Sequence, residues 1–304
     1  MNKNFLAQSR LVMDVLPFIA EEKVFALKGG TAINFFIRDL PRLSVDIDLT
    51  YCPIESRDAT LKKSNDAFDR IIDKLKNRLG VHIVLQRDRK GEFVAKVDVQ
   101  SKYAQIKIEP NFVFRGSVFP VKELQTQSKV AETLERTVKM QVLSFEDLYA
   151  GKLCATLNRQ HPRDLFDMKL LLDNEGISDE MRKAFVVYLA SDSRPINELL
   201  NPNLHDFSLN YQSEFSGMTN IEIGAQELVD IRDYLCKNII KILSDNEKQF
   251  LLSLIRMEPK WDLLSLPVDI NDLPGIKFKI LNLESMEPKK RMQYGEKLEA
   301  IFKC

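Results

Sequence analysis

The sequence has few cysteines, no excess of charge of either sign and no long apolar run. Its four cysteines lie far apart without a Cys-x-x-Cys pair, which argues against thiolate metal sites and favours reduced thiols in a cytosolic protein. The 44 basic and 44 acidic side chains balance, so no overall field draws the chain to nucleic acid or to a membrane. No run approaches about 18 apolar residues, and Asp14 and Pro17 interrupt the apolar N-terminal segment, so we expect neither a membrane span nor a signal peptide.

The pattern of apolar residues predicts an α+β half followed by a helical half. The 304 residues suffice for two domains, which we place at residues 1–140 and 141–304. The first domain is expected to hold helices over 8–20, 31–38 and 57–79 and strands over 25–29, 43–51, 81–87, 92–100, 103–114 and, at its end, 139–144. The second is expected to hold helices over 145–158, 178–190, 221–243, 245–257 and 287–302, another from Pro162, and a long loop over 201–220.

Two aspartates stand one residue apart in the expected strand 43–51. Alternate side chains leave a strand on the same face, so the carboxylates of Asp46 and Asp48 lie near each other. Without a partner, such a pair is destabilising or has one pKa forced upward. A divalent cation removes this cost, because Mg²⁺ is typically held by one or two carboxylates together with substrate phosphates. A strand end whose aspartates simply face water is the alternative.

A glycine pair precedes the aspartates, at the start of the helix expected over 31–38. Gly29 and Gly30 would present free backbone N–H groups and the positive end of the helix dipole to a phosphate, and Thr31 would add a hydroxyl. Ser44 projects from the same face as Asp46, so it is a candidate for a phosphate contact or for a modification. A plain tight turn and a serine bonded to its own backbone are the alternatives. The order of strand, Gly-Gly, helix, strand and Asp-x-Asp favours phosphoryl or nucleotidyl transfer.

A later segment, SFEDLYAGKLCATLNRQHPRDLFDMKLLL (144–172), places charged residues on the apolar side of helices. Lys152 follows Tyr149 by three positions, so its ammonium lies on the apolar face and needs an anion such as a triphosphate or a carboxylate. A lysine whose stem lies along the surface is the alternative. The adjacent Gly151 suggests the close approach of another group. Asp164 stabilises its helix dipole in any case, and its position at the head of an apolar stripe allows it to point toward Lys152.

These motifs together resemble those of a known superfamily. "GGTAINFFIRDLPRLSVDIDL" is similar to the nucleotidyltransferase signature of Gly-Gly, a spacer and Asp-x-Asp. The 15 residues between Gly30 and Asp46, the ending "RLSVDIDL" and the segment 144–172 resemble the AbiEii/AbiGii toxin family of nucleotidyltransferase-like proteins. The resemblance spans residues from about 24 to 175. It implies a polymerase-β-like α+β core with a mixed sheet, followed by a mainly helical C-terminal half.

The resemblance also implies roles for particular residues. Catalysis would depend on Asp46, Asp48, Lys152 and Asp164, and the nucleotide would contact Gly29, Gly30, Thr31, Ser44 and Lys152. A third carboxylate on a neighbouring strand would help to bind Mg²⁺ or Mn²⁺. Glu109 in "IKIE" is favoured for this position beside Asp46 and Asp48, although Asp98 in "KVDVQ" stays open and either acid is equally compatible with an exposed edge.

The function implied by the resemblance is the transfer of NMP from an NTP to an acceptor. We expect a cytoplasmic toxin of a type IV toxin–antitoxin or abortive-infection pair, with RNA, and first a tRNA end, as the acceptor. A cognate antitoxin is expected as a genetic partner, and no membrane partner is expected. Three alternatives stay open: a nucleotidyltransferase for small molecules such as antibiotics, a kinase-like phosphotransferase, and an inactive nucleotide-binding regulator.

Overall fold

The computed structural model describes residues 1–303, in which seven strands form one sheet in the order β3-β4-β5-β2-β1-β7-β6. Neighbours β2 and β5 run parallel, as do β1 and β7, and the other pairs are antiparallel. With the helices below, this mixed sheet confirms the expected α+β class. The strands span β1 Phe25–Lys28, β2 Asp46–Tyr51, β3 His82–Arg87, β4 Val94–Gln100, β5 Gln105–Asn111, β6 Lys122–Gln125 and β7 Lys139–Val142.

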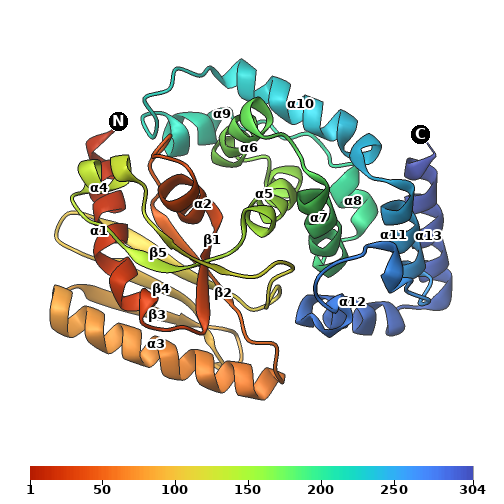
Figure 1. Cartoon of the computed structure of the whole chain (residues 1–304), viewed down its shortest axis with the longest axis horizontal. Helices are drawn as coiled ribbons and strands as arrows, with labels where there is room; N and C mark the ends of the chain where they lie inside the picture. The colour runs from red at the N-terminus through yellow and green to blue at the C-terminus, as the bar shows by residue number, and fades with distance from the viewer. Residues whose placement is uncertain (304) are drawn as a thin grey trace. The chain divides into compact units, whose positions relative to one another are not determined.

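Alternation along the strands gives the sheet an apolar face and a polar face. In β2, Leu49 and its apolar neighbours at alternate positions are fully buried, whereas Asp46 and Asp48 between them are partly accessible. The ring of Phe68 in α3 lies 5.2 Å from that of Phe25 in β1, on the apolar side, so α3 covers that face (Figure 1). We call the opposite face, which carries Asp46 and Asp48, the carboxylate face.

The helices beside the sheet begin and end as their sequences indicate. They are α1 Lys3–Ala20, α2 Gly29–Ala32, the π-helical turn η1 Ile33–Ile37, α3 Arg57–Leu79 and α4 Ser128–Leu134. Ser56 caps the start of α3 by accepting a hydrogen bond from the backbone N–H of Ala59, and Gly80 ends it in the left-handed conformation, with φ 61°. The helix expected over 31–38 begins two residues earlier, at Gly29, and its second part is π-helical.

Within residues 145–303, every named element is helical. They are α5 Phe145–Arg159, α6 Pro162–Asn174, α7 Asp179–Ser191, α8 Ile196–Leu200, α9 Ser208–Asn210, η2 Tyr211–Phe215, α10 Ala225–Ile242, α11 Asp245–Ile255, η3 Trp261–Leu263, η4 Ile270–Asp272, α12 Pro274–Glu284 and α13 Pro288–Phe302. As expected, Pro162 occupies the first turn of its helix. Part of the segment 201–220, expected to be a loop, is helical at α9 and η2.

The chain divides into two compact units, and each is described by itself. Unit 1 comprises Met1–Ser144 and Phe215–Glu222, and unit 2 comprises Phe145–Glu214 and the chain from Ile223 onward. The expected domains did not include the segment 215–222 in the unit that contains the sheet. That segment is anchored by hydrogen bonds, including one that the Leu43 N–H donates to the carbonyl of Met218. Met218 is buried, and no periodicity in its polar surroundings would have indicated this.

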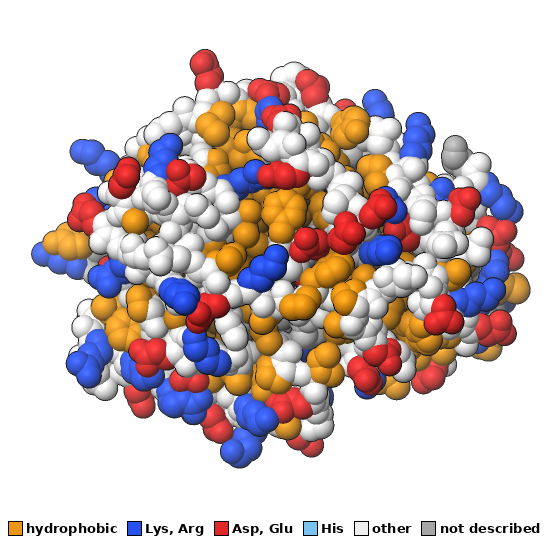
Figure 2. Space-filling model, viewed as in Figure 1, with side chains coloured by type: hydrophobic (Ala, Val, Ile, Leu, Met, Phe, Trp, Pro, Cys, Tyr) orange, Lys and Arg blue, Asp and Glu red, His pale blue; other side chains and the backbone are white. Residues whose placement is uncertain are grey.

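None of the helices within residues 1–303 is long and apolar enough to cross a membrane. On the face seen in Figure 2, acidic and basic side chains are interspersed rather than separated by sign. Cys52, Cys154 and Cys236 are free thiols, and the fourth cysteine, Cys304, lies outside the described residues.

Candidate functional site

Both glycines of the Gly-Gly pair stand where a side chain would collide. Gly29 has φ 70°, and a Cβ atom added there would lie 2.2 Å from Oδ2 of Asp48. A Cβ atom at Gly30 would lie 2.7 Å from Nη2 of Arg42 and 3.3 Å from Oγ of Ser44. Close approach of the aspartate and the buried arginine therefore requires glycine at both positions. The carboxylate of Asp48 lies directly against the start of α2.

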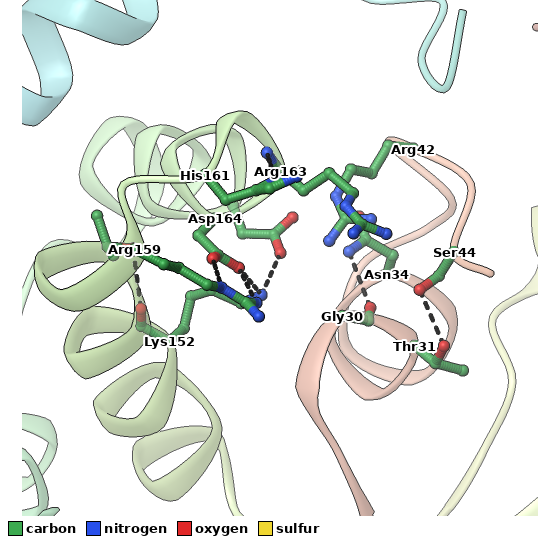
Figure 3. A network of polar contacts seen from close by, with 12 residues as sticks. Gly30, Thr31, Asn34, Arg42, Ser44, Lys152, Arg159, His161, Arg163 and Asp164 are labelled. Atoms are coloured by element: carbon green, nitrogen blue, oxygen red, sulfur yellow. Dashed lines mark hydrogen bonds and ion pairs between the residues drawn. The ribbon is translucent and has the colours of Figure 1, made fainter. Parts of the chain in front are cut away.

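Two hydroxyl groups connect the start of α2 to β2. Oγ1 of Thr31 lies 2.9 Å from Oγ of Ser44 and 2.5 Å from the carbonyl oxygen of Asp46. In addition, the side-chain amide of Asn34 donates a hydrogen bond to the Gly30 carbonyl at 2.9 Å (Figure 3). Both hydroxyls are buried and engaged within the protein. They hold the glycine turn against the aspartates, and a direct contact of either hydroxyl with a nucleotide stays a prediction.

Glu109 joins the two aspartates on the carboxylate face. In the parallel pairing of β2 with β5, Asp48 lies opposite Glu109 and Asp46 lies opposite Lys107. Burial raises the pKa of Glu109, and the neighbouring charges of Asp48 and then Asp46 raise it further. Three carboxylates on two adjacent strands thus interact electrostatically beside the glycine turn.

Hydrogen bonding distinguishes Glu109 from the other candidate, Asp98. The Asp98 carboxylate lies 3.2 Å from the Lys96 ammonium, and it accepts hydrogen bonds from the amides of Gln86 at 2.9 Å and Gln105 at 3.5 Å. Within residues 1–303, Glu109 has no hydrogen-bond or ion-pair partner. Asp98 therefore has a structural role that accounts for it, whereas Glu109 lacks one.

The donor set on the carboxylate face consists of carboxylate oxygens. The described part of the chain contains no group of three or more His, Cys, Asp or Glu side chains placed to hold a metal ion. Mg²⁺ commonly needs only one or two protein carboxylates, because water and substrate phosphates complete its shell. The assignment of Asp46, Asp48 and Glu109 to a metal thus stays a prediction.

In unit 2, α5 and α6 enclose a buried group of charges around Lys152. The Lys152 ammonium lies 2.8 Å from Oδ1 of Asp164 and 3.0 Å from Oδ2 of Asp167, and all three side chains are at most 5% exposed. The pairing of Lys152 with Asp164 agrees with the spacing of these residues on their helices. Asp167 is the second carboxylate of the group, one turn further along α6.

Arg159 completes this group and was not predicted from the sequence. Its Nε donates to Oδ2 of Asp164 at 2.5 Å and its Nη2 to Oδ1 at 3.1 Å, while 62% of its side chain remains exposed (Figure 3). Burial alone would raise the pKa of Asp164, but the charges of Lys152 and Arg159 hold it well below its ordinary value. Arg159 follows Lys152 by seven residues, two helical turns, and this spacing is the signal that would have found it.

The glycine beside Lys152 has a packing explanation. A Cβ atom at Gly151 would lie 3.0 Å from Cε1 of Tyr188 in α7. The Tyr188 hydroxyl in turn donates to the carboxylate of Asp147 at 3.3 Å. The close approach expected at Gly151 is therefore that of α7 in the same unit.

His161 acts as a cap between α5 and α6. Its Nδ1 accepts a hydrogen bond from the Arg163 N–H at 3.1 Å, and its Nε2 lies 3.1 Å from a carboxylate oxygen of Glu214. Burial, followed by the nearby charge of Arg163, lowers the pKa of His161. The neutral ring with its proton on Nε2 satisfies both contacts, so this histidine orients the start of α6.

Comparison with known proteins places these motifs in a family. The sequence matches the family model "Nucleotidyl transferase AbiEii toxin, Type IV TA system" over residues 10–265. Among solved structures, the chain resembles the nucleotidyltransferase toxin MenT4 of Mycobacterium tuberculosis, with a TM-score of 0.60, 16% identity, and coverage of 81% of this chain and 87% of that one. At this identity the likeness shows a shared fold.

No curated protein matches the sequence. The family match nevertheless includes both units of the chain, from α1 to beyond α11, and it contains the Gly-Gly pair, the Asp-x-Asp pair and the Lys152 group. The resemblance noted in the sequence is thereby confirmed: the chain belongs to the AbiEii family of nucleotidyltransferase toxins of type IV toxin–antitoxin systems.

Proposed function

We propose that this nucleotidyltransferase is Mg²⁺-dependent and transfers NMP from an NTP to RNA, releasing pyrophosphate. The observation that carries the proposal is the carboxylate face, where Asp46, Asp48 and Glu109 interact beside a glycine turn that admits no side chain. Crowded carboxylates in this position are stabilised by a divalent cation. The same position suits the phosphates of a nucleotide, because the start of α2 offers backbone N–H groups.

The donor set fits Mg²⁺ or Mn²⁺. Asp46 and Asp48 would hold the ion, aided by Glu109, and Gly29 leaves the Asp48 carboxylate unobstructed at the start of α2. A bound ion would supply neutralisation of the triphosphate charge. The backbone at Gly29 and Gly30 would orient the phosphates, and the bonds of Thr31 and Ser44 would hold that backbone in place.

For the Lys152 group we propose a role in gripping the triphosphate. The ammonium carries three hydrogens, and Asp164 and Asp167 each accept from it, so one N–H direction is left for a phosphate oxygen. Asp164 would orient Lys152, and Arg159 would hold Asp164 in its charged form. A purely structural role for the group is the alternative, and the activity of a double variant with partly restored stability distinguishes the two.

For the acceptor we propose RNA, with a tRNA end as the first candidate. The support is the family's toxin function, because arrest of growth by nucleotidyl transfer requires an essential cellular acceptor. The family also implies a cognate antitoxin, which we propose as a genetic partner. We further propose that the protein acts in the cytoplasm, where NTPs and RNA are available and where free thiols such as Cys52 persist.

Labelled nucleotides test this proposal against its alternatives. The protein is incubated with Mg²⁺, total cellular RNA and each NTP labelled on the α-phosphate, beside an Asp46→Asn variant that keeps the size of the side chain. We expect label on RNA with the unmodified protein alone, and none without a divalent metal. Transfer of a γ-phosphate label would instead indicate a kinase. Label on small molecules with none on RNA would indicate a small-molecule enzyme, and no transfer at all would contradict the proposal.

A further inference from the structure

One lysine on the carboxylate face, Lys107, acts on the candidate acids only through its charge, which opposes the rise in the pKa of Glu109. Lys107 of β5 lies opposite Asp46 of β2 on one side and opposite Asp98 of β4 on the other. Its side chain is exposed, and the described residues provide it with no ion pair or hydrogen bond. Other lysines of unit 1 do form ion pairs, for example Lys63 with Glu55 at 2.6 Å.

One of the two aspartates opposite Lys107 is already bonded to other side chains. Residues directly opposite each other on adjacent strands have Cβ atoms about 5 Å apart, so both aspartates are within reach of the Lys107 side chain. The Asp98 carboxylate is already occupied by Lys96 and by the amides of Gln86 and Gln105. A cation with free N–H groups therefore stands next to the candidate catalytic acids.

The glycine turn and Lys107 lie on opposite sides of β2 in the sheet. The glycine turn follows β1, which adjoins β2 on one edge, whereas Lys107 lies on β5, which adjoins β2 on the other. In phosphoryl and nucleotidyl transfer the attacking and leaving oxygens lie roughly in line. With the leaving pyrophosphate held at the glycine turn, approach of the attacking hydroxyl from the β5 side, where Lys107 lies, satisfies this arrangement.

We propose that Lys107 is the centre of an acceptor subsite that binds a backbone phosphate of the RNA next to the attacking hydroxyl. This inference rests on the proposed function and names the part of the site that receives the RNA. A lysine ammonium is a point charge suited to a phosphodiester. Further from Asp46 and Asp48, the exposed Gln100 of β4 supplies an amide group suited to a 2′-hydroxyl.

Binding of RNA at increasing salt tests this subsite without catalysis. The probe is a short fluorescein-labelled single-stranded RNA with a free 3′-hydroxyl, followed by fluorescence anisotropy in Mg²⁺ without NTP. We expect Lys107→Gln to weaken binding about three- to tenfold at physiological salt. The slope of log K against log salt should fall by about 0.7, the value for one lost contact to a single-strand phosphate. Lys107→Arg should keep most of the affinity.

Matched controls separate this effect from a general loss of charge. Lys62 is an exposed lysine of α3, the helix on the apolar face, so Lys62→Gln should leave both affinity and slope unchanged. Equal thermal unfolding of the three variants shows that each is folded. The affinity for an NTP analogue that cannot be cleaved at the α-phosphate should be the same with Lys107→Gln as with the unmodified protein.

Several results would overturn the subsite. These are an unchanged salt slope in Lys107→Gln, no measurable RNA binding by the unmodified protein, and tighter binding of DNA of the same sequence. A loss of NTP affinity with intact RNA binding would assign Lys107 to the triphosphate instead. A different result would contradict the proposed function alone: RNA binding would still depend on Lys107, but no α-phosphate label would be transferred.

Discussion

Removing the Lys152 ammonium should destabilise the protein as well as inactivate it. The ammonium neutralises Asp164 and Asp167, whose side chains are 1% and 0% exposed, from 2.8 and 3.0 Å. In Lys152→Met the two carboxylates lose that cation in a buried site, while Asp164 keeps its hydrogen bonds from Arg159. Breaking a buried ion pair from one side typically costs about 3–5 kcal/mol. We therefore expect the free energy of unfolding to fall by about that amount.

A double variant distinguishes the electrostatic explanation from a loss of packing. The double variant combines Lys152→Met with Asp167→Asn. The second change removes the carboxylate charge of Asp167, and Asp164 keeps its hydrogen bonds from Arg159. We expect this pair of changes to recover about half of the lost stability, roughly 2 kcal/mol. Activity should not return, because neither methionine nor asparagine supplies the cation proposed to grip the triphosphate.

Urea unfolding followed by circular dichroism gives these free energies, and α-label transfer gives the activities. The slope of free energy against urea should stay the same across the variants, since the surface exposed on unfolding is unchanged. A loss below about 1 kcal/mol in Lys152→Met would refute the argument that the lysine neutralises buried carboxylates. Recovery of activity in the double variant would show that Lys152 acts through structure and not on the nucleotide.

Two further predictions concern a glycine and a buried lysine. Gly29→Ala should lower NMP transfer about a hundredfold, because the added Cβ atom would displace the Asp48 carboxylate. Gly80→Ala is the control: Gly80 has a similar φ of 61°, and an added Cβ atom there would meet nothing within 4 Å. It should show the same backbone strain with full activity. Burial lowers the pKa of Lys279 from 10.5 to about 8, so the unfolded chain binds more protons between these values. The free energy of unfolding, measured in urea against Lys279→Met, should therefore rise with pH from 8 to 10.5, by up to about 3 kcal/mol, and a decrease would contradict the burial argument.

The strands and their acidic pair were predictable because alternation is a local signal. The buried residues of β2 alternate with Asp46 and Asp48, so the period of two that defines a strand is legible in the sequence itself. The start of β2 was expected three residues too early, since Leu43 and Val45 are apolar and buried without belonging to the strand. Burial of a residue and its membership of a strand are separate properties that one pattern cannot distinguish.

Helix α12 was not predicted because its pattern is inverted. Lys279 is buried and donates to the carbonyls of Asp192 and Arg194 at 2.8 Å each, whereas Phe278 and Leu281 are exposed. The lysine supplies hydrogen bonds just after the end of α7, a position where a cation is favourable. Partners so distant in sequence leave no periodic signal. The short β6 and α4 were missed for a different reason, since four and seven residues are too few to show a period.

The choice between Glu109 and Asp98 shows what pairing adds to a motif. Asp98 in β4 and Glu109 in β5 each lie between apolar residues of their strands, and the local sequence does not favour either as the third carboxylate. The register places Asp98 among Lys96, Gln86 and Gln105, which satisfy it, and places Glu109 opposite Asp48 with no partner. Glu109 is exposed to solvent, but the neighbouring charges of Asp48 and Asp46 raise its pKa and make its ionised form less favourable in the folded protein. A cation bound from outside the chain would offset this repulsion. Glu109→Gln should therefore raise the free energy of unfolding while lowering NMP transfer, whereas Asp98→Asn should destabilise the sheet. If Glu109→Gln instead unfolds more easily, the carboxylate has a structural role and its assignment to the metal fails.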